Sequence, residues 1–262
     1  MQSLFFSNAS DNTGAGHLYR IWCLVAVSYL LLMWLLNIAG GDLWLAGKWY
    51  ALQGQHWLLR DHWLTEQVLH KGARQLNYLL TAVVLLLTIR ALRQYRTAPQ
   101  LARSYVALAL SLLSAFAVVA ALKAVTNVAC PWSLSLFGGN EAYFSLLQPR
   151  PDSLPYSRCF PAGHASVGYA WVALYDFFAR VKPSWRRAGL LAGLTAGAVL
   201  GLNQQLRGAH FMSHDLTTLL LCLLCSKGCF ALMHRSNNNS PTRDNSAALS
   251  HTADKLQSHC TK

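Results

Sequence analysis

The clearest structural signal in the chain is the run 104-SYVALALSLLSAFAVVAAL-122, which holds no charged residue and ends directly before Lys123. As an α-helix these residues would extend about 28 Å, close to the ~30 Å thickness of the hydrocarbon core of a bilayer. A stretch this long and this apolar is typical of a membrane-spanning helix. We therefore interpret the chain as a membrane protein and expect further spans on either side.

Five other apolar runs resemble spans. The run 75–89 is short, but Arg74 and Arg90 at its ends can extend their side chains to the membrane surface. Two of the runs carry one charge each near an end, Asp176 and Lys227. The sequence thus predicts an all-α, polytopic membrane protein with six transmembrane helices in one domain, residues 21–234. Besides 104–122, the predicted spans are 21–41, 75–89, 164–178, 188–206 and 216–233.

The composition supports a membrane protein and argues against other classes. Only 12% of the 262 residues are charged, about half the share in an average soluble domain, whereas 53% are hydrophobic. This deficit excludes a disordered chain and a nucleic-acid-binding one, despite the net charge of +12. The seven cysteines are too few and too scattered for a secreted disulfide scaffold. We expect a membrane, and no nucleic acid, as the partner.

Basic residues are concentrated in two connections. Residues 90–103 hold four arginines, and residues 180–187 hold three arginines and one lysine, with no acidic residue in either stretch. With six spans, both connections lie on the same side of the membrane, where the excess of Lys and Arg predicts the cytoplasm. The polar N-terminus, residues 1–20, and a disordered tail, residues 235–262, are predicted on the same side. The N-terminus lacks the pattern of a cleaved signal peptide.

The first outward connection, residues 42–75, is rich in tryptophan. Its mixture of Trp, Leu and charged residues is typical of helices that lie at the membrane interface, and a lipid-recruiting surface is the alternative. Its histidines have no regular helical spacing, and we interpret them as interfacial. The tryptophans are Trp44, Trp49, Trp57 and Trp63, and the histidines are His56, His62 and His70.

Ionisable residues gather at the predicted outer ends of the spans. Lys123 ends the third span, residues 159–164 read CFPAGH, and residues 204–215 read QQLRGAHFMSHD. An ionisable group at a single span end is commonly an anchor, whereas Lys, Arg, His and Asp together at one membrane face indicate a functional site. Cations and backbone N–H groups before a helix suit a phosphate anion.

The order and spacing of these residues resemble a three-part signature, K-x6-RP, PSGH and SR-x5-H-x3-D, of the type-2 phosphatidic acid phosphatase superfamily. The corresponding segments are Lys123-x6-Cys130-Pro131, Pro161-Ala162-Gly163-His164, and Gly208-Ala209-His210 followed by Asp215. The resemblance implies six helices, an active site that faces outward, and phosphatase chemistry that needs neither a metal nor another cofactor.

The chain departs from this signature where the family has phosphate-binding arginines. Cys130 stands in place of the first arginine, and Asn203-Gln204 stands in place of Ser-Arg. Arg207, one helical turn after Gln204, is the natural substitute. Ala162 stands where the family has Ser. We interpret these changes as the mark of a divergent subgroup.

By resemblance, His210 is the nucleophile that forms a phosphohistidine, and His164 protonates the leaving oxygen and then activates water. Asp215 would hold the opposite nitrogen of His210, but it comes five residues after His210 rather than four. His214 occupies the expected place and lies closer on a regular helix, so both alternatives stay open. The phosphate-binding residues would be Lys123, Ala162, Gly163 and Arg207.

Cys130 and Cys159 lie in one predicted outward loop, each beside one of the first two motifs. An oxidising compartment permits a disulfide there. The bridge would tie the two phosphate-binding segments together where the arginine is lost. A pair of free buried thiols is the alternative.

The sequence therefore predicts a lipid phosphatase of the bacterial inner membrane with its active site facing the periplasm. The resemblance leaves three substrates open: undecaprenyl diphosphate, lipid A and phosphatidylglycerol phosphate. One alternative is a phosphotransferase of the same superfamily, which passes the phosphate to another lipid. Another is a catalytically silent lipid-binding membrane protein. A zinc site is disfavoured because no H-E-x-x-H pattern is present, and the oligomeric state stays open.

Overall fold

The computed structural model describes residues 9–146, 148–151 and 153–234. Within these ranges the chain consists of helices and their connections, and no strand forms. The predicted all-α class is therefore confirmed for the described part. The predicted tail, residues 235–262, and the first eight residues of the predicted polar N-terminus lie outside the described residues.

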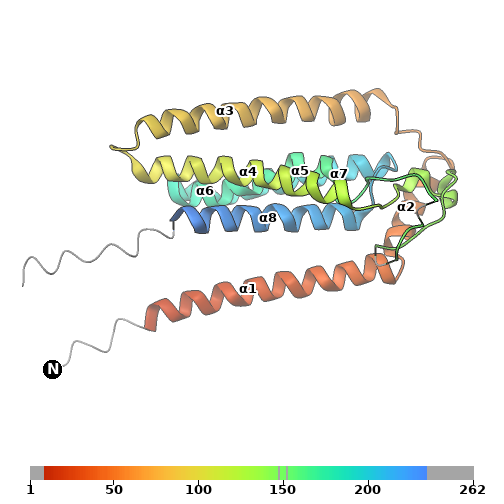
Figure 1. Cartoon of the computed structure of the whole chain (residues 1–262), viewed down its shortest axis with the longest axis horizontal. Coiled ribbons are helices and arrows are strands. Elements are labelled where there is room, and N and C mark those ends of the chain that lie inside the picture. Colours follow the sequence, from red (N-terminus) through yellow and green to blue (C-terminus); the bar gives the residue numbers. More distant parts are fainter. Residues whose placement is uncertain (1–8, 147, 152, 235–262) are drawn as a thin grey trace, which may run out of the picture.

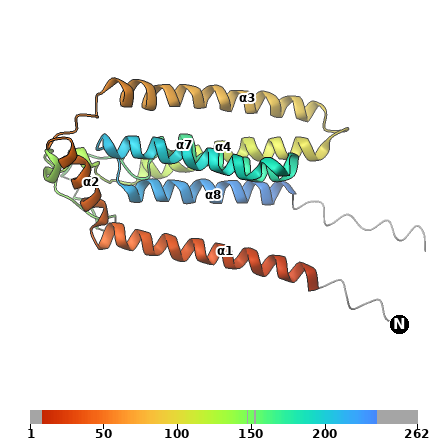
Figure 2. The ribbon, with the colours of Figure 1, turned by 180° about the vertical axis from the view of Figure 1, so that it is seen from behind.

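The long helices run side by side along one axis, with an inner group between α1 and α3 (Figure 1). The view from behind shows the same order (Figure 2). The outer helices are α1 (Ala9–Met33), followed by the π-helical segment η1 (Trp34–Ile38), and α3 (Ala73–Arg93), preceded by the π-helical segment η2 (Leu64–Gly72). The inner helices are α4 (Pro99–Val125), α5 (Gly163–Tyr169), α6 (Leu174–Val181), α7 (Arg186–Leu206) and α8 (Met212–His234), and η5 (Ala170–Ala173) joins α5 to α6.

Four helical segments are long and apolar enough to cross a membrane: Tyr19–Ile38, Leu64–Arg93, Pro99–Val125 and Met212–His234. They correspond to the first, second, third and sixth predicted spans, and the second is longer than predicted because η2 extends α3 at its start. The predicted spans 164–178 and 188–206 are helical too, but the first is divided among three short helical segments. The second lies in a helix of 21 residues, which is long enough but less apolar than the four candidates. The count of six spans stays a prediction.

The outer helices present apolar side chains to the surroundings. In the apolar part of α1 no residue is buried, and Leu24, Val27 and Leu30 are each more than 60% exposed. On α3, Leu79 and Leu86 are exposed to a similar degree. Soluble monomers rarely expose apolar patches of this extent, so these faces are suited to lipid.

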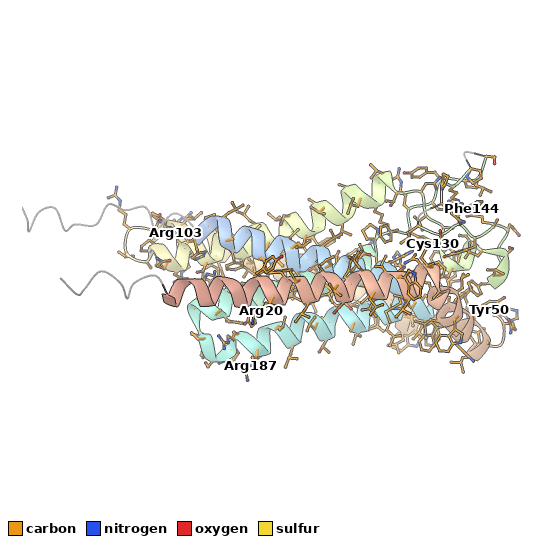
Figure 3. The ribbon with its side chains drawn as sticks, turned by 90° about the horizontal axis from the view of Figure 1, so that it is seen from below. Arg20, Tyr50, Arg103, Cys130, Phe144 and Arg187 are labelled. Carbon is orange, nitrogen blue, oxygen red and sulfur yellow. A yellow bond between two sulfur atoms is a disulfide. The ribbon has the colours of Figure 1, made fainter. Side chains whose placement is uncertain are left out.

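One end of the bundle carries the basic connections. Figure 3 shows Arg20, Arg103 and Arg187 at this end, whereas Tyr50 and Cys130 lie at the other. The turn between α3 and α4 and the turn between α6 and α7 both lie at the basic end, because these helices alternate in direction. The two Lys/Arg-rich connections are therefore on one side of the molecule, as the sequence predicts.

The two charged residues within the predicted fourth and sixth spans pair with each other. Lys227 Nζ lies 2.6 Å from Asp176 Oδ1, and Ser226 Oγ donates to Asp176 Oδ2 at 2.9 Å. Paired charges are far less costly inside a membrane protein than isolated ones. This ion pair holds α6 against α8.

The tryptophan-rich connection folds across the other end of the bundle. Its first part is helix α2 (Gly41–Leu52), which lies across the ends of the long helices (Figure 1). The rings of Tyr50, Trp57 and Phe137 then pack together, with centroids 5.2–6.0 Å apart, and Trp57 Nε1 donates to the Phe137 carbonyl oxygen. This end therefore has its own small core, outside the apolar bundle.

Glycines allow α7 to approach α5 and α6 closely. They recur every fourth residue, at Gly189, Gly193, Gly197 and Gly201. At the closest point, a Cβ added to Gly168 of α5 would lie 2.2 Å from the backbone nitrogen of Gly197. Small residues spaced in this way bring helix backbones together in membrane proteins. The contact leaves no room for a side chain on either helix.

The substitution Gly168→Ala is expected to push α5 away from α7, because the new methyl group would meet backbone that cannot move alone. We expect a loss of about 1–3 kcal/mol in stability, seen as a lower thermal midpoint in detergent. Gly228→Ala on α8 is the matched control, since nothing lies within 4 Å of its Cβ position. An equal effect of both substitutions would contradict the packing described.

Candidate active site

His210 lies in the connection between α7 and α8. The connection turns at Gly208, whose φ is +71°, and a Cβ there would lie 2.5 Å from the Trp57 ring. Glycine accepts this backbone conformation without strain and leaves the space that the Trp57 ring fills. The His210 ring is buried, and its Nδ1 lies 3.4 Å from Nδ1 of His214.

Burial lowers the pKa of His210 well below its ordinary value. The positive charges of Lys123 and of His214 in its protonated form lower this pKa further, whereas a backbone hydrogen bond with Cys159 opposes them. The imidazole is therefore neutral near pH 7. A neutral imidazole has a lone pair for nucleophilic attack.

His164 is the second residue of α5. Its Nε2 lies 3.2 Å from the Leu69 carbonyl oxygen, and because a carbonyl can only accept, this nitrogen carries a proton. The ring stacks on His70, with centroids 4.1 Å apart and planes 15° apart. Nδ1 of His164 is the nitrogen left for other chemistry.

Lys123 comes from the last turn of α4 and lies over the start of α5. Its Nζ is 3.6 Å from the position that a Cβ on Gly163 would occupy. Lys123, Gly163, His164 and His210 line one cavity of about 620 Å³. The structure thus brings together four of the residues that the sequence predicts for the site.

The cavity extends from this polar end between α3 and α4. On α3 its lining changes from Arg74 and Asn77 to Leu85, and on α4 it changes from Lys123 to Leu113. From residue 123 to residue 113 a helix rises about 15 Å, half the thickness of the hydrocarbon core. The cavity therefore has a cationic end and continues as an apolar groove between α3 and α4.

Ala162 lies beside the cavity rather than in its lining. Its side chain is fully buried, and its backbone N–H donates to the His214 carbonyl oxygen at 3.4 Å. The Thr218 hydroxyl donates to the Ala162 carbonyl oxygen. Both hydrogen bonds fasten the segment before α5 to α8, so the N–H predicted for phosphate already has an acceptor.

Asp215 points away from His210. Its Oδ2 accepts a hydrogen bond from Gln205 Nε2 at 2.6 Å, and its carboxylate packs against Gly201. The ring beside His210 is that of His214, four residues further along the chain. Helix α8 begins at Met212, so these two neighbouring residues project in different directions. Of the two alternatives, His214 has the contact with His210.

Arg207 lies behind the cavity, with its donors already used. Its Nε donates to the Arg60 carbonyl oxygen at 2.8 Å, its Nη1 donates to Gln204, and its Nη2 forms an ion pair with Glu66. It is absent from the residues that line the cavity. The structure therefore does not bring Arg207 together with Lys123, because η2 supplies a carboxylate that holds it.

His70 is a site residue that sequence analysis missed. It lines the cavity, stacks on His164, and its Nδ1 accepts a hydrogen bond from Gln204 Nε2 at 2.8 Å. The interpretation as an interfacial residue rested on irregular spacing, which is unreliable here because η2 is π-helical. Such segments are frequent at functional sites.

Asp42 connects α2 to the start of α8. Its carboxylate accepts hydrogen bonds from the backbone N–H and the hydroxyl of Ser213. Burial raises the pKa of Asp42, and the hydrogen bonds from Ser213 oppose that change. An acceptor at this position satisfies a free N–H of the first turn of α8 and so steadies the connection that carries His210.

Cys130 and Cys159 form a disulfide, with Cα atoms 5.3 Å apart. The bridge closes the loop between α4 and α5, and the Cys159 backbone N–H also donates to the Val128 carbonyl oxygen. Because backbone of Cys159 hydrogen-bonds His210, the bridge supports one wall of the site.

Among the residues described, no three His, Cys, Asp or Glu side chains gather in a way that could hold a metal ion. The independence from metals that the resemblance implies stays a prediction. A chelator tests it directly.

The fold and site define a helical membrane protein with a cavity at one end that is lined by the buried His164 and His210 and the half-buried Lys123. A family model described as the PAP2 superfamily matches residues 104–238, just over half of the chain, and the chain belongs to this superfamily. Membership indicates phosphatase-type activity on lipid-like substrates. No curated protein and no solved structure matches the chain significantly.

Opening the disulfide is expected to loosen the wall beside His210. We expect Cys130→Ser to lower the thermal midpoint, consistent with about 2–4 kcal/mol for a bridge that closes a loop of this length. Mass spectrometry after alkylation without reductant should find no free thiol at Cys130 or Cys159. Cys23→Ser on α1 is the control, and two alkylated thiols in the wild type would contradict the bridge.

The lowered pKa of His210 predicts how stability changes with pH. In the unfolded chain this group binds a proton near pH 6.5, but in the folded protein it does so only at much lower pH. Stability should therefore fall as pH drops below 6.5, by at most about 1.4 kcal/mol per unit from this residue. The thermal midpoint of His210→Gln should fall less steeply between pH 6.5 and 5; identical slopes would refute the assignment.

Proposed function

We propose that this protein is a membrane lipid phosphatase that removes a phosphate or diphosphate group from an envelope lipid through a phosphohistidine at His210. One observation carries the proposal: the cavity that contains Lys123, His164 and His210 continues along the apolar faces of α3 and α4. A phosphorylated lipid has the same two parts, an anionic head and an apolar chain. The head would meet the cationic end while the chain stays between the helices.

In the first step, His210 Nε2 attacks phosphorus, and the N–P bond forms as the bond from phosphorus to the lipid oxygen breaks. The facing Nδ1 atoms of His210 and His214 support this choice of nitrogen, because they leave Nε2 for the substrate. His164 protonates the departing oxygen. Lys123 stabilises the negative charge on the phosphoryl oxygens.

The proton for the leaving oxygen would come from Nδ1 of His164, because Nε2 is held by the Leu69 carbonyl oxygen. His164 must therefore be doubly protonated before the first step, and a bound phosphate favours that form by its negative charge. In the second step, water attacks phosphorus and gives a proton to His164 Nδ1. The N–P bond breaks, phosphate leaves and His210 is restored.

His214 is our proposed orienting group for His210. When His210 Nδ1 donates its proton to His214 Nδ1, the reactive Nε2 keeps its lone pair. Asp215 stays the alternative. Comparison of His214→Ala with Asp215→Asn separates the two, since only the orienting residue should lower kcat and leave KM unchanged.

We further propose six spans in a bacterial inner membrane, with the site facing the periplasm. The Lys/Arg-rich connections at the opposite end of the bundle support this orientation. The disulfide supports it as well, because disulfides persist in oxidising compartments such as the periplasm. Undecaprenyl diphosphate, lipid A and phosphatidylglycerol phosphate are the substrates to compare.

The full chain, purified in detergent, is expected to release inorganic phosphate from at least one of these lipids, with or without chelator. His210→Ala should reduce release by several orders of magnitude, because it removes the nucleophile. His56→Ala is the matched control, since this exposed histidine contacts the Gly54 carbonyl oxygen and is not among the residues that line the cavity. Full activity of His210→Ala would overturn the proposed mechanism.

Two further arms of this experiment test the alternatives. If phosphate appears on an added acceptor lipid rather than in solution, the protein is a phosphotransferase. If no lipid is turned over but lipid binding persists in His210→Ala, the protein is a catalytically silent lipid binder.

A further inference from the structure

We propose that Arg74, on the first turn of α3, binds the substrate phosphate together with Lys123. This inference rests on the proposed function and names the second cation of the same site. It assigns phosphate binding to a residue outside the region that the family model matches, residues 104–238. From the sequence alone, Arg74 is expected only to anchor the end of a span.

The site lacks the arginines that the signature of the superfamily contains. Cys130 is in a disulfide, and Gln204 donates to His70 rather than presenting a charge. Arg207 is held by Glu66 and by the Arg60 carbonyl oxygen. Because a phosphate monoester or diphosphate carries about two negative charges, Lys123 alone leaves it incompletely neutralised.

Arg74 is the arginine that lines the cavity. Among the described lining residues, the cationic side chains are Arg74 from α3 and Lys123 from α4. They come from two different helices. No ion pair or hydrogen bond holds the guanidinium of Arg74 in the part of the chain described, so its donors are available for a ligand.

The other arginines near this end of the bundle already have contacts. Arg60 stacks on Trp132 with its Cζ 4.3 Å from the ring centroid, and Arg150 pairs with Glu141. Arg158 lies over the ring of Tyr156. None of these three lines the cavity. Arg74 is thus distinguished by both its position and its free donors.

Arg74 lies one helical turn beyond His70 on the same face of the helix. His70 is fixed by its stack on His164 and by the hydrogen bond from Gln204. Gln204 stands where the signature has an arginine. It carries no charge itself, but its hydrogen bond to His70 holds the helix on which Arg74 lies. The planar guanidinium can then hold two phosphate oxygens at once, which the ammonium of Lys123 cannot.

The test is binding of inorganic phosphate to the purified full chain by isothermal titration calorimetry, alongside lipid hydrolysis. Arg74→Ala should weaken phosphate binding at least tenfold and lower kcat/KM, and Arg74→Lys should lie between it and the wild type. Arg90→Ala, at the other end of α3, should change neither. Equal thermal midpoints establish that the variants fold.

The results separate this inference from the proposed function. If phosphate binding depends on Arg74 but no lipid is hydrolysed, the inference is supported and the proposed phosphatase function is rejected. Hydrolysis that needs His210, with phosphate binding unchanged in Arg74→Ala, overturns the inference and leaves the phosphatase. Loss of phosphate binding in Arg207→Ala but not in Arg74→Ala also overturns it. A wild type that neither binds phosphate nor hydrolyses lipid overturns both.

Discussion

The close contact of Gly168 with Gly197 is the constraint on which the geometry of the site depends. Helix α5 begins at Gly163 and carries His164 in its first turn, while α7 leads into the connection that carries His210. The distance between the two helix axes therefore controls how the two rings face the same cavity. Hydrophobic attraction cannot provide this specificity within lipid, where small residues and direct backbone packing hold helices together.

Polar contacts then hold the site at the end of the bundle. Asp42 fastens the start of α8, the disulfide fastens the loop before α5, and Gln204 fastens η2. Each comes from a different part of the chain. Because buried polar groups are costly when unpaired, such contacts give one preferred arrangement to side chains that could otherwise turn in several directions. Three histidines, Lys123 and Arg74 can therefore line the cavity beside an apolar wall.

Several residues that line the cavity could be predicted from the sequence because the motifs lie at the ends of apolar runs, and helix ends on one side of a membrane come together in the fold. Lys123, Gly163 and His164 lie where the apolar runs end or begin, and His210 lies between two runs, so all reach one face. The disulfide pair follows from the same logic. His70 escaped prediction because the π-helical η2 changes the direction in which each side chain points. The ion pair between Arg207 and Glu66 joins residues that are far apart in the chain, so no local sequence pattern predicts it.

Apolar runs, the Lys/Arg bias and the order of the motifs are properties of the chain, and they predict the helical class, the two ends and four residues that line the cavity. Packing decides which side chains face the cavity. Neighbours such as His214 and Asp215 differ by about 100° around a helix, so a small change in where α8 begins exchanges their roles. Likewise Arg74 and Arg207 are both arginines near the site, but only contacts made after folding leave one free and bind the other.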